Sequence, residues 1–210
     1  MDIAVVGAGG HSKVICDMIA SKGYQVRALL DDRFAEVAEQ NGVWCGPVSA
    51  ADGLIERFNG IKFIIAIGNN AIRKKLVARL NLPNESYVTL AHETAVISPS
   101  ASIGPGTVVM AHAVVQADAS IGHHAIINTA AIVEHDNRTG DYVHIAPRAT
   151  LTGDVRIGEG AMLGAGATVI PGMSVGEWAV VGAGATVISP IPAYCTAVGT
   201  PAKVIAKAPA

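Results

Sequence analysis

Residues 101–133 read ASIGPGTVVMAHAVVQADASIGHHAIINTAAIV and carry an aliphatic side chain at every sixth position. The series extends from Ile97 to Val187, and fifteen of its sixteen positions are Ile, Val or Leu. A period of six matches neither an α-helix, with about 3.6 residues per turn, nor the alternation of a half-buried strand. It predicts a parallel β-helix of hexapeptide repeats, in which each short strand points one aliphatic side chain toward the axis.

Glycine marks a longer period within the first. It recurs every eighteen residues, the length of three hexapeptides, at Gly104, Gly122, Gly140, Gly158 and Gly176. Each coil is therefore expected to be a triangle with three short sides and small residues near its corners. A β-sandwich would instead show turn signals about every 8 to 12 residues without a fixed phase. Stacked coils form a rod whose sides are exposed, so we expect copies of the chain to associate through these sides.

The first ninety residues have a different pattern. Short apolar runs alternate with helix-like segments, in the order 3–6, 11–21, 24–30, 62–67 and 70–80. This alternation predicts a small Rossmann-like α/β domain with a parallel sheet. Seven of the nine leucines lie at or before Leu90, and no lysine lies between Lys75 and Lys203, so the composition changes near residue 91. We predict two domains, 1–90 and 91–210, the second ending in a C-terminal tail.

The composition excludes several classes of protein. Half of the residues are hydrophobic, 4% are aromatic and 15% are charged, which fits neither a disordered chain nor a coiled coil. A formal net charge of -2 gives no electrostatic reason for binding nucleic acid or an anionic membrane. No apolar run approaches the roughly 18 residues that span a bilayer, and Met1 leads directly into a strand. We expect a cytoplasmic protein with reduced thiols at Cys16, Cys45 and Cys195.

A glycine-rich segment joins the first strand to the first helix. Gly7-Ala8-Gly9 places backbone N–H groups at a helix N-terminus, where they form an anion site. Asp31 and Asp32 follow at about the spacing at which a carboxylate binds a ribose hydroxyl, so spacing alone leaves NAD open. Ser12 departs from the dinucleotide fingerprint, and about 85 residues are too few for both halves of a dinucleotide fold. A single nucleotide is the favoured ligand, and a structural turn without a ligand is the alternative.

The repeat breaks in the coil that contains Glu134-His135-Asp136. Asn137 stands where most repeats have a small residue, and Thr139 is the non-aliphatic member of the six-residue series. Local rules tend to fail at functional sites, so the break singles out His135 among the seven histidines. Asp136 is expected to fix the tautomer of this imidazole and raise its basicity, as a general base requires. The alternative is a histidine without a catalytic role.

The repeat, together with the ending Gly199-Thr200-Pro201-Ala202-Lys203, resembles the left-handed β-helix hexapeptide acyltransferases over residues 91–205. The left hand of the β-helix is implied by this resemblance alone, since parallel crossovers are usually right-handed. Three segments of the first ninety residues are similar to a subfamily that contains bacterial UDP-4-amino-sugar N-acetyltransferases and sialic acid O-acetyltransferases. They are Gly7-Ala8-Gly9-Gly10-His11-Ser12, Asp31-Asp32, and Ala66-Ile67-Gly68-Asn69-Asn70 with the following Ile72-Arg73-Lys74-Lys75.

The resemblance implies an acetyl-CoA-dependent N-acetyltransferase that needs no metal. Its acceptor would be the 4-amino group of a UDP-4-amino-4,6-dideoxy-N-acetylhexosamine, and its product UDP-N,N'-diacetylbacillosamine or a close relative. Transfer would be direct, with His135 as the general base, because no Cys or Ser is placed like an acyl-enzyme nucleophile. The family also implies a homotrimer with active sites between subunits.

The same resemblance implies roles for individual residues. The amide of Gly153 would bind the oxyanion of the tetrahedral intermediate. Acetyl-CoA would contact His144, Ala165 and Ala183. The UDP-sugar would contact Gly9, Gly10, His11, Asp31, Asp32 and Gly68. Asn128, one side of the coil before His135, is expected to orient the substrate.

Three other functions stay open. An O-acetyltransferase acting on sialic acid or a related sugar would use the same base and coenzyme. A zinc hydratase similar to the γ-type carbonic anhydrases would need three histidines at an open site, and His112, His135 and His144 lack the spacing of that family. A binding module without activity would use the rod as a scaffold and the glycine-rich segment as a nucleotide sensor.

Overall fold

The computed structural model describes residues 1–207, so the last three residues of the predicted C-terminal tail, 208–210, lie outside the described part. The chain divides into two compact units, Met1–Leu90 and Ala91–Ala210, which we call the N-terminal unit and the β-helix unit. In the part of the chain that the structure describes, no helix combines the length and apolar character needed to cross a membrane.

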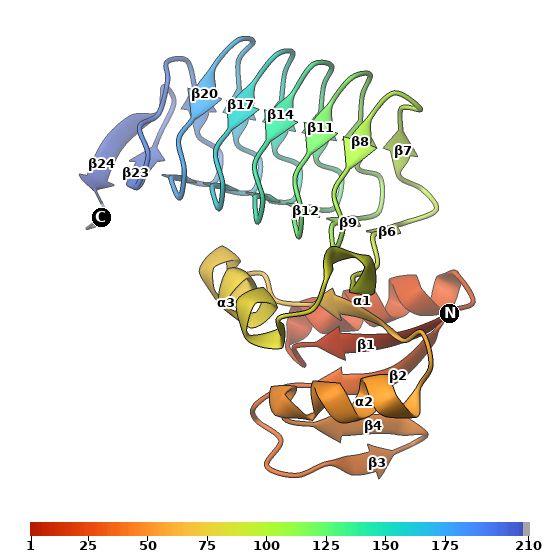
Figure 1. The fold of residues 1–210 in the computed structure, drawn as a ribbon. Helices are drawn as coiled ribbons and strands as arrows, with labels where there is room; N and C mark the ends of the chain where they lie inside the picture. The colour runs from red at the N-terminus through yellow and green to blue at the C-terminus, as the bar shows by residue number, and fades with distance from the viewer. Residues whose placement is uncertain (208–210) are drawn as a thin grey trace. The chain divides into compact units, whose positions relative to one another are not determined.

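The N-terminal unit is an α/β domain with a mostly parallel sheet (Figure 1). The strand order is β3-β4-β2-β1-β5, and each neighbouring pair is parallel except β3 with β4. Its elements are β1 (Asp2–Val6), α1 (Gly10–Ser21), β2 (Gln25–Leu30), β3 (Ala38–Gln40), β4 (Val43–Gly46), a 3₁₀ turn (Val48–Ala50), α2 (Ala51–Arg57), β5 (Lys62–Ile65), α3 (Asn70–Leu80) and a second 3₁₀ turn (Asn84–Ser86).

Alternating side chains of β1 bury both faces of this sheet. Ala4 and Val6 belong to one buried cluster with Leu54 of α2. Ile3 and Val5, which are fully buried, point to the opposite face, and α1 packs against β1 and β2. The apolar runs and helical segments read from the sequence are β1, α1, β2, β5 and α3, so the α/β prediction is confirmed. The sequence did not reveal β3, because all three of its residues are exposed.

The β-helix unit is built, over its described residues, from three sheets that form the sides of a triangular coil (Figure 1). Sheet 1 contains β7 (Val96–Ile97), β10 (Val114–Val115), β13 (Ile132–Val133), β16 (Thr150–Leu151), β19 (Thr168–Val169) and β22 (Thr186–Val187). Sheet 2 contains β8 (Ser102–Ile103), β11 (Ser120–Ile121), β14 (Arg138–Thr139), β17 (Arg156–Ile157) and β20 (Ser174–Val175). Sheet 3 contains β6 (Leu90–Ala91), β9 (Val108–Val109), β12 (Ile126–Ile127), β15 (His144–Ile145), β18 (Met162–Leu163), β21 (Val180–Val181), β23 (Cys195–Val198) and the antiparallel β24 (Lys203–Lys207).

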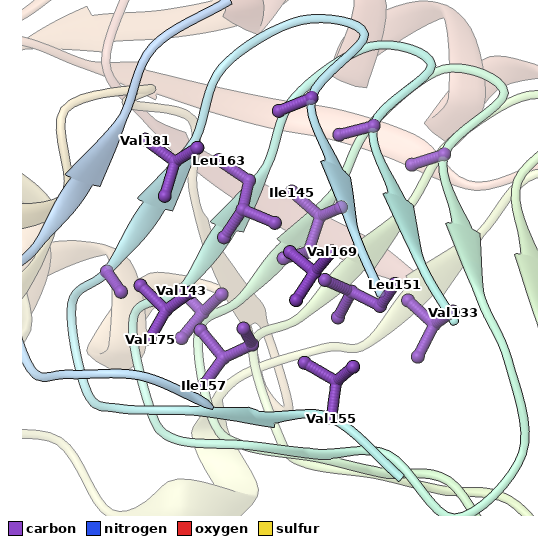
Figure 2. Close-up of a cluster of buried hydrophobic side chains, with 14 of the residues drawn as sticks. Val133, Val143, Ile145, Leu151, Val155, Ile157, Leu163, Val169, Val175 and Val181 are labelled. Atoms are coloured by element: carbon purple, nitrogen blue, oxygen red, sulfur yellow. The ribbon is translucent and has the colours of Figure 1, made fainter. Parts of the chain in front are cut away.

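Strands of successive coils pair in parallel at a separation of eighteen residues. Val114 pairs with Ile132, and Ile132 pairs with Thr150. Inward side chains such as Val133, Ile145 and Leu151 are fully buried in one continuous core (Figure 2). The hexapeptide prediction is therefore confirmed, because each inward position of the coil meets the same apolar environment as the position one coil earlier.

The corners of the coil are tight turns with a left-handed residue. Where sheet 1 leads into sheet 2, Asp118, Asp136 and Asp154 take this position in successive coils, with φ of 59°, 61° and 53°. Aspartate tolerates a positive φ better than most residues do. We call this corner, formed by 116–119, 134–137, 152–155 and 170–173, corner A. The corner between sheets 3 and 1, formed by 110–113, 128–131, 146–149, 164–167 and 182–185, is corner B.

Candidate active site

The glycine-rich loop lies at the carboxyl edge of the N-terminal sheet. Because β1 lies between β2 and β5, the segments that follow these strands, 7–9, 31–32 and 66–69, emerge at one edge. In open α/β sheets the ligand crevice lies at this edge, where the strand order reverses. A hollow of about 150 Å³ opens there, lined by apolar side chains and by Gly7, Asp31 and Asp32.

The glycines of this edge are of two kinds. Gly7 has a φ of +108°, and a Cβ atom added to it would lie 2.5 Å from Cδ1 of Ile67, so the fold itself requires glycine there. Gly9, Gly10 and Gly68 have no such φ, and an added Cβ would have no neighbour within 4 Å in the described structure. Their missing side chains leave open space beside the N-terminus of α1, where backbone N–H groups favour an anion.

Asp31 and Asp32 are both held as carboxylates. Oδ2 of Asp31 accepts the N–H of Ala8 at 2.7 Å, and Oδ1 accepts the N–H of Arg33 at 3.1 Å. Partial burial acts to raise the pKa of Asp31, but these hydrogen bonds and the Arg33 guanidinium lower it overall. Hydrogen bonding from its ion-pair partner Arg79 is the main cause of the lowered pKa of Asp32. Asp31 therefore ties the glycine-rich loop to the end of β2.

His11 lies in the first turn of α1 and is partly buried. Its Nε2 atom is buried and forms no hydrogen bond within residues 1–207. Burial, followed by the positive charge of Arg73, lowers the pKa of this imidazole, so His11 is neutral at neutral pH. Arg73 of α3 is itself only 1% exposed. The sequence reading placed it in a motif but gave it no role, since burial of a single arginine has no sequence signal.

His135 lies in corner A, directly after β13. Its Nδ1 lies 2.7 Å from Oδ2 of Asp136, and the two side chains are 61% and 58% exposed. A carboxylate only accepts hydrogen bonds, so Nδ1 carries the proton and Nε2 keeps its lone pair. This bond to Asp136 is the main cause of the raised pKa of His135. Desolvation acts to lower this pKa, and the negative charges of Asp136, Glu134 and Asp154 act with the hydrogen bond to raise it.

Gly153 lies beside this imidazole, one coil later in corner A. The N–H of Asp154 donates to the carbonyl oxygen of His135 at 3.0 Å, so the two turns stack directly. A Cβ atom at Gly153 would lie 2.7 Å from both Cε1 and Nε2 of His135, so the imidazole requires glycine at this position. Within the described residues, the Gly153 N–H has no hydrogen-bond acceptor. The structure thus brings His135, Asp136 and Gly153 together.

Asn137, which marked the break in the repeat, is fully buried in the same corner. Its Nδ2 donates to the carbonyl oxygens of Glu134 at 2.6 Å and Thr152 at 2.8 Å. Its Oδ1 accepts the N–H of Val155 at 3.1 Å. The break therefore has a structural cause, because Asn137 fastens the turn that carries His135 to the turn of the next coil. The sequence pointed to this coil but not to the role of its asparagine.

The residues expected to contact acetyl-CoA lie elsewhere on the coil. Nδ2 of Asn128 lies 3.0 Å from Nε2 of His144, a largely buried residue of β15. Ala165 and Ala183 are exposed in successive coils of corner B. The structure does not bring this group next to His135, because Asn128 precedes β13 and His135 follows it. The two groups lie at opposite ends of the strands of sheet 1.

The side of corner A that faces sheet 2 is charged. A hollow of about 350 Å³ there is lined by Asp118, Asp136, Arg138, Asp154 and Arg156. Across the residues that the structure describes, no three His, Cys, Asp or Glu side chains are grouped as metal ligands would be.

Known families match both units. The N-terminal unit matches the PglD N-terminal domain over residues 2–80. The β-helix unit matches the bacterial transferase hexapeptide (six repeats) over residues 138–171 and 154–189. UDP-N-acetylbacillosamine N-acetyltransferase of Bacillus subtilis is 48% identical over 111 residues, which are 52% of this chain and 51% of that protein. The match thus spans about half the length of this curated relative.

Solved structures match over nearly the whole chain. A variant of perosamine N-acetyltransferase from Caulobacter crescentus, in complex with CoA and GDP-perosamine, superposes with a TM-score of 0.90 at 37% identity, covering 99% of this chain and 98% of that one. The acetyltransferase domain of PglB from Neisseria gonorrhoeae, in complex with acetyl coenzyme A, gives 0.85 at 38% identity, covering 97% and 98%. This chain therefore belongs to the family of left-handed β-helix sugar N-acetyltransferases with a PglD-type N-terminal domain and hexapeptide repeats.

Proposed function

We propose that this chain transfers an acetyl group from acetyl-CoA to the 4-amino group of a UDP-4-amino-4,6-dideoxy-N-acetylhexosamine, forming UDP-N,N'-diacetylbacillosamine or a close relative. The observation that carries the proposal is the imidazole of His135, hydrogen-bonded to Asp136 and lying beside Gly153. The relatives support a nucleotide amino sugar as the acceptor, since one is named for UDP-N-acetylbacillosamine and another holds GDP-perosamine.

His135 is the general base. The neutral amine attacks the carbonyl carbon of the thioester, and Nε2 takes the proton from the nitrogen as the C–N bond forms. The tetrahedral intermediate then collapses, the C–S bond breaks, and the imidazolium returns the proton to the leaving thiolate. Asp136 keeps the proton on Nδ1 and stabilises the imidazolium. A base of this kind contributes about 10²- to 10⁴-fold to the rate.

Gly153 supplies the donor for the oxyanion. Its amide lies in the turn stacked on His135 and has no acceptor within the described residues. A backbone donor aimed at a developing oxyanion is worth about 10²- to 10³-fold in turnover. Because this donor and the base share one corner, the thioester carbonyl and the amine both bind at corner A. Transfer is direct, without an acyl-enzyme.

The N-terminal unit binds the nucleotide sugar. Gly9, Gly10 and Gly68 leave space at the carboxyl edge of its sheet, and the N-terminus of α1 favours the diphosphate. Asp31 and Asp32 are ionised acceptors for sugar or base donors at the same edge. His11 contributes as a neutral imidazole. Asn128 orients the acceptor sugar in the β-helix unit.

Acetyl-CoA binds along corner B, at His144, Ala165 and Ala183. The exposed alanines, with Gly166 and Gly184 beside them, leave room for the extended arm of the coenzyme, because an added Cβ at either glycine would meet nothing within 4 Å. The Asn128 amide holds the imidazole of His144 in place. The coenzyme supplies the activated acetyl group, and these residues orient it.

The active form is a homotrimer with sites between subunits. Corner A with His135 and corner B with Ala165 lie at opposite ends of the strands of sheet 1 in one chain. A coenzyme that contacts both corners therefore joins two chains. Exposed aliphatic side chains on the β-helix unit, such as Val96 at 60% and Ile188 at 50%, favour this association. Light scattering of the purified chain gives its mass, and a monomer with full activity would contradict the shared site.

An acceptor panel tests the activity. The purified chain is incubated with acetyl-CoA and, separately, a UDP-4-amino-4,6-dideoxy-N-acetylhexosamine, GDP-perosamine, dTDP-linked 4-amino sugars and sialic acid, and release of the CoA thiol is measured. We expect release with the UDP-4-amino sugar at a kcat/KM at least about tenfold above every other acceptor. His135→Gln is the control for enzyme-dependent release. Acetylation of sialic acid alone, or of no acceptor, would overturn the proposal.

A further inference from the structure

The outer face of sheet 2 carries two neighbouring arginines. The first residue of each strand in this sheet points outward, because the second residue points toward the axis of the coil. In β14 and β17, which lie side by side (Figure 1), the outward residues are Arg138 and Arg156, paired in parallel register. In the other three strands of sheet 2 the outward residues are Ser102, Ser120 and Ser174. Serine is thus the ordinary residue at this position, and the arginines are the exception.

The two arginines follow the two turns that carry the proposed catalytic groups. β14 begins directly after the turn 134–137, which contains His135. β17 begins directly after the turn 152–155, which contains Gly153. Since the coils before and after these two have serine at the same place, the exception is confined to the coils of the candidate active site.

Within the chain, the two guanidinium groups have little to bind. Arg156 lies 3.4 Å from Asp154, but both side chains are more than half exposed, so this ion pair contributes little to stability. Across residues 1–207, the guanidinium of Arg138 makes no hydrogen bond and no ion pair. Like charges that face each other on neighbouring strands are destabilising. Folding therefore gives no reason for this pair of arginines, whereas an anion from outside the chain would.

A hollow of about 350 Å³ joins these arginines to the base. Arg138 and Arg156 line it on the strands of sheet 2, and aspartates line it on the turns of corner A. One of these aspartates is Asp136, whose Oδ2 lies 2.7 Å from Nδ1 of His135. The hollow thus has carboxylates beside the base and guanidinium groups on the strands that follow. A ligand with an amine and an anionic group fits this distribution of charge.

A nucleotide amino sugar has these two groups on opposite sides of one sugar ring. The amine is bonded to C4, and the diphosphate is bonded to the anomeric carbon. In acetyl-CoA, by contrast, the whole pantetheine arm separates the thioester from the phosphates. An anion that binds on the strand directly after the turn of the base, while the reacting atoms lie at that base, therefore belongs to the acceptor. Guanidinium groups suit this anion, because they bind phosphate through two parallel N–H···O bonds.

We propose that Arg138 and Arg156 bind the phosphate that is bonded to the acceptor sugar, and thereby place its 4-amino group at His135. They are substrate-binding residues that give specificity for a diphosphate-linked sugar, and they take no part in proton transfer. This role adds to the contacts proposed for the diphosphate at the start of α1, and it rests on the proposed function only for the class of ligand.

Nucleotides that differ by one phosphate test this role. UMP has the phosphate bonded to the nucleoside, and UDP adds the phosphate that would carry the sugar. Their binding, with GMP and GDP in parallel, is measured by calorimetry for the wild-type chain and for the double variant Arg138→Ser, Arg156→Ser. We expect the double variant to bind the diphosphate at least about tenfold more weakly and to bind the monophosphate and CoA as the wild type does.

The substitutions are matched to the chain. Serine already occupies the same strand position in three other coils, so the double variant should fold, and thermal unfolding checks this. Lys22→Ser removes an exposed positive charge at the end of α1 and is the control for a change in net charge. It should bind all of the ligands with wild-type affinity.

The other outcomes are equally distinct. An equal loss of affinity for the monophosphate and the diphosphate, or no loss for either, would contradict the proposed contact. Weaker binding of CoA alone would contradict it too, since the anion would then be a phosphate of the coenzyme. A wild-type chain that binds neither UDP nor GDP also overturns the role. A chain that binds a diphosphate with the expected dependence on the arginines but transfers no acetyl group overturns only the proposed function.

Discussion

Gly153 lies so close to His135 that a Cβ atom added to it would be 2.7 Å from both Cε1 and Nε2 of the imidazole. This contact links two coils, because Gly153 follows His135 by one full turn of the β-helix. The backbone of Gly153 does not have a positive φ, so alanine fits the main chain. What alanine would displace is the imidazole and its Nε2 atom.

Gly153→Ala is therefore expected to lower kcat about 10²-fold, since a shift of about 1 Å in a catalytic group has an effect of this size. The measurement is steady-state acetyl transfer, with thermal unfolding to show that the variant is folded. Gly53→Ala, at a position where an added Cβ meets nothing within 4 Å, is the control and should leave kcat unchanged. Wild-type turnover in Gly153→Ala would show that the imidazole at this place is not the base.

Asp136→Asn is expected to shift the acid limb of the pH profile. Asp136 raises the pKa of His135, and His135 acts as a base only when deprotonated, so kcat/KM rises as pH passes upward through that raised pKa. An amide cannot stabilise the imidazolium, so the pKa of His135 falls and the limb moves to lower pH. Turnover also falls, but less than in His135→Ala.

The matched control for Asp136→Asn is Asp118→Asn, which changes the same turn position one coil earlier. We expect its pH profile to follow the wild type, because Asp118 is not among the charges that raise the pKa of His135. An acid limb that stays in place in Asp136→Asn would remove the assigned role of this carboxylate.

Asn137→Ala is expected to destabilise the chain and to lower activity through the turn that it holds. The substitution leaves the carbonyl oxygens of Glu134 and Thr152 and the N–H of Val155 without their partner in a buried corner. Losses of this kind cost about 1 to 3 kcal/mol per unsatisfied group, so the loss of all three partners should lower the free energy of unfolding by at least about 3 kcal/mol.

Urea unfolding of Asn137→Ala measures this loss, with Gln116→Ala, at the start of the same turn one coil earlier, as the control. No hydrogen bond involves the Gln116 side chain within the described residues, so its removal should change stability by less than about 0.5 kcal/mol. Equal stability of the two variants would show that Asn137 does not fasten the corner.

Asp31→Asn is expected to raise KM for the nucleotide sugar about tenfold while KM for acetyl-CoA stays unchanged. The carboxylate accepts the N–H groups of Ala8 and Arg33 with its two oxygens, and an amide keeps only one acceptor, so the glycine-rich loop loses a tie to β2. Asp2→Asn removes the carboxylate of another partly buried ion pair, with Arg27 at 3.1 Å, and serves as the control. A rise in both KM values would indicate a general loss of structure.

The helices and strands were predictable from the sequence where their apolar residues follow a periodic pattern. The strands from β7 to β22 repeat one environment every six residues, and β1, α1, β2, β5 and α3 are buried runs or amphipathic segments. Strands β3 and β4 and helix α2 were not predicted. The residues of β3 are all exposed, and β4 and α2 are too short for a period to stand out.

The residues of the candidate site also fall into two groups, those that the sequence marked and those that it did not. Its glycines, Asp31 and His135 were visible because a loop and a broken repeat marked them in the sequence. Arg73 and the role of Asn137 were not, because burial of a polar side chain depends on which backbone groups surround it. Neither the carbonyls that Arg73 binds nor the turn that Asn137 fastens has a sequence signature.

The sequence by itself determined the β-helix, since its period of six is set by local geometry and pairs each strand with one exactly eighteen residues away. It also determined the α/β character of the N-terminal unit. Only the tertiary structure decided that Asp136 reaches the imidazole of His135, that Gly153 leaves room beside it, and that corners A and B lie apart. The physical reason is that a period specifies which face a side chain occupies, whereas contacts between side chains depend on how turns of successive coils stack.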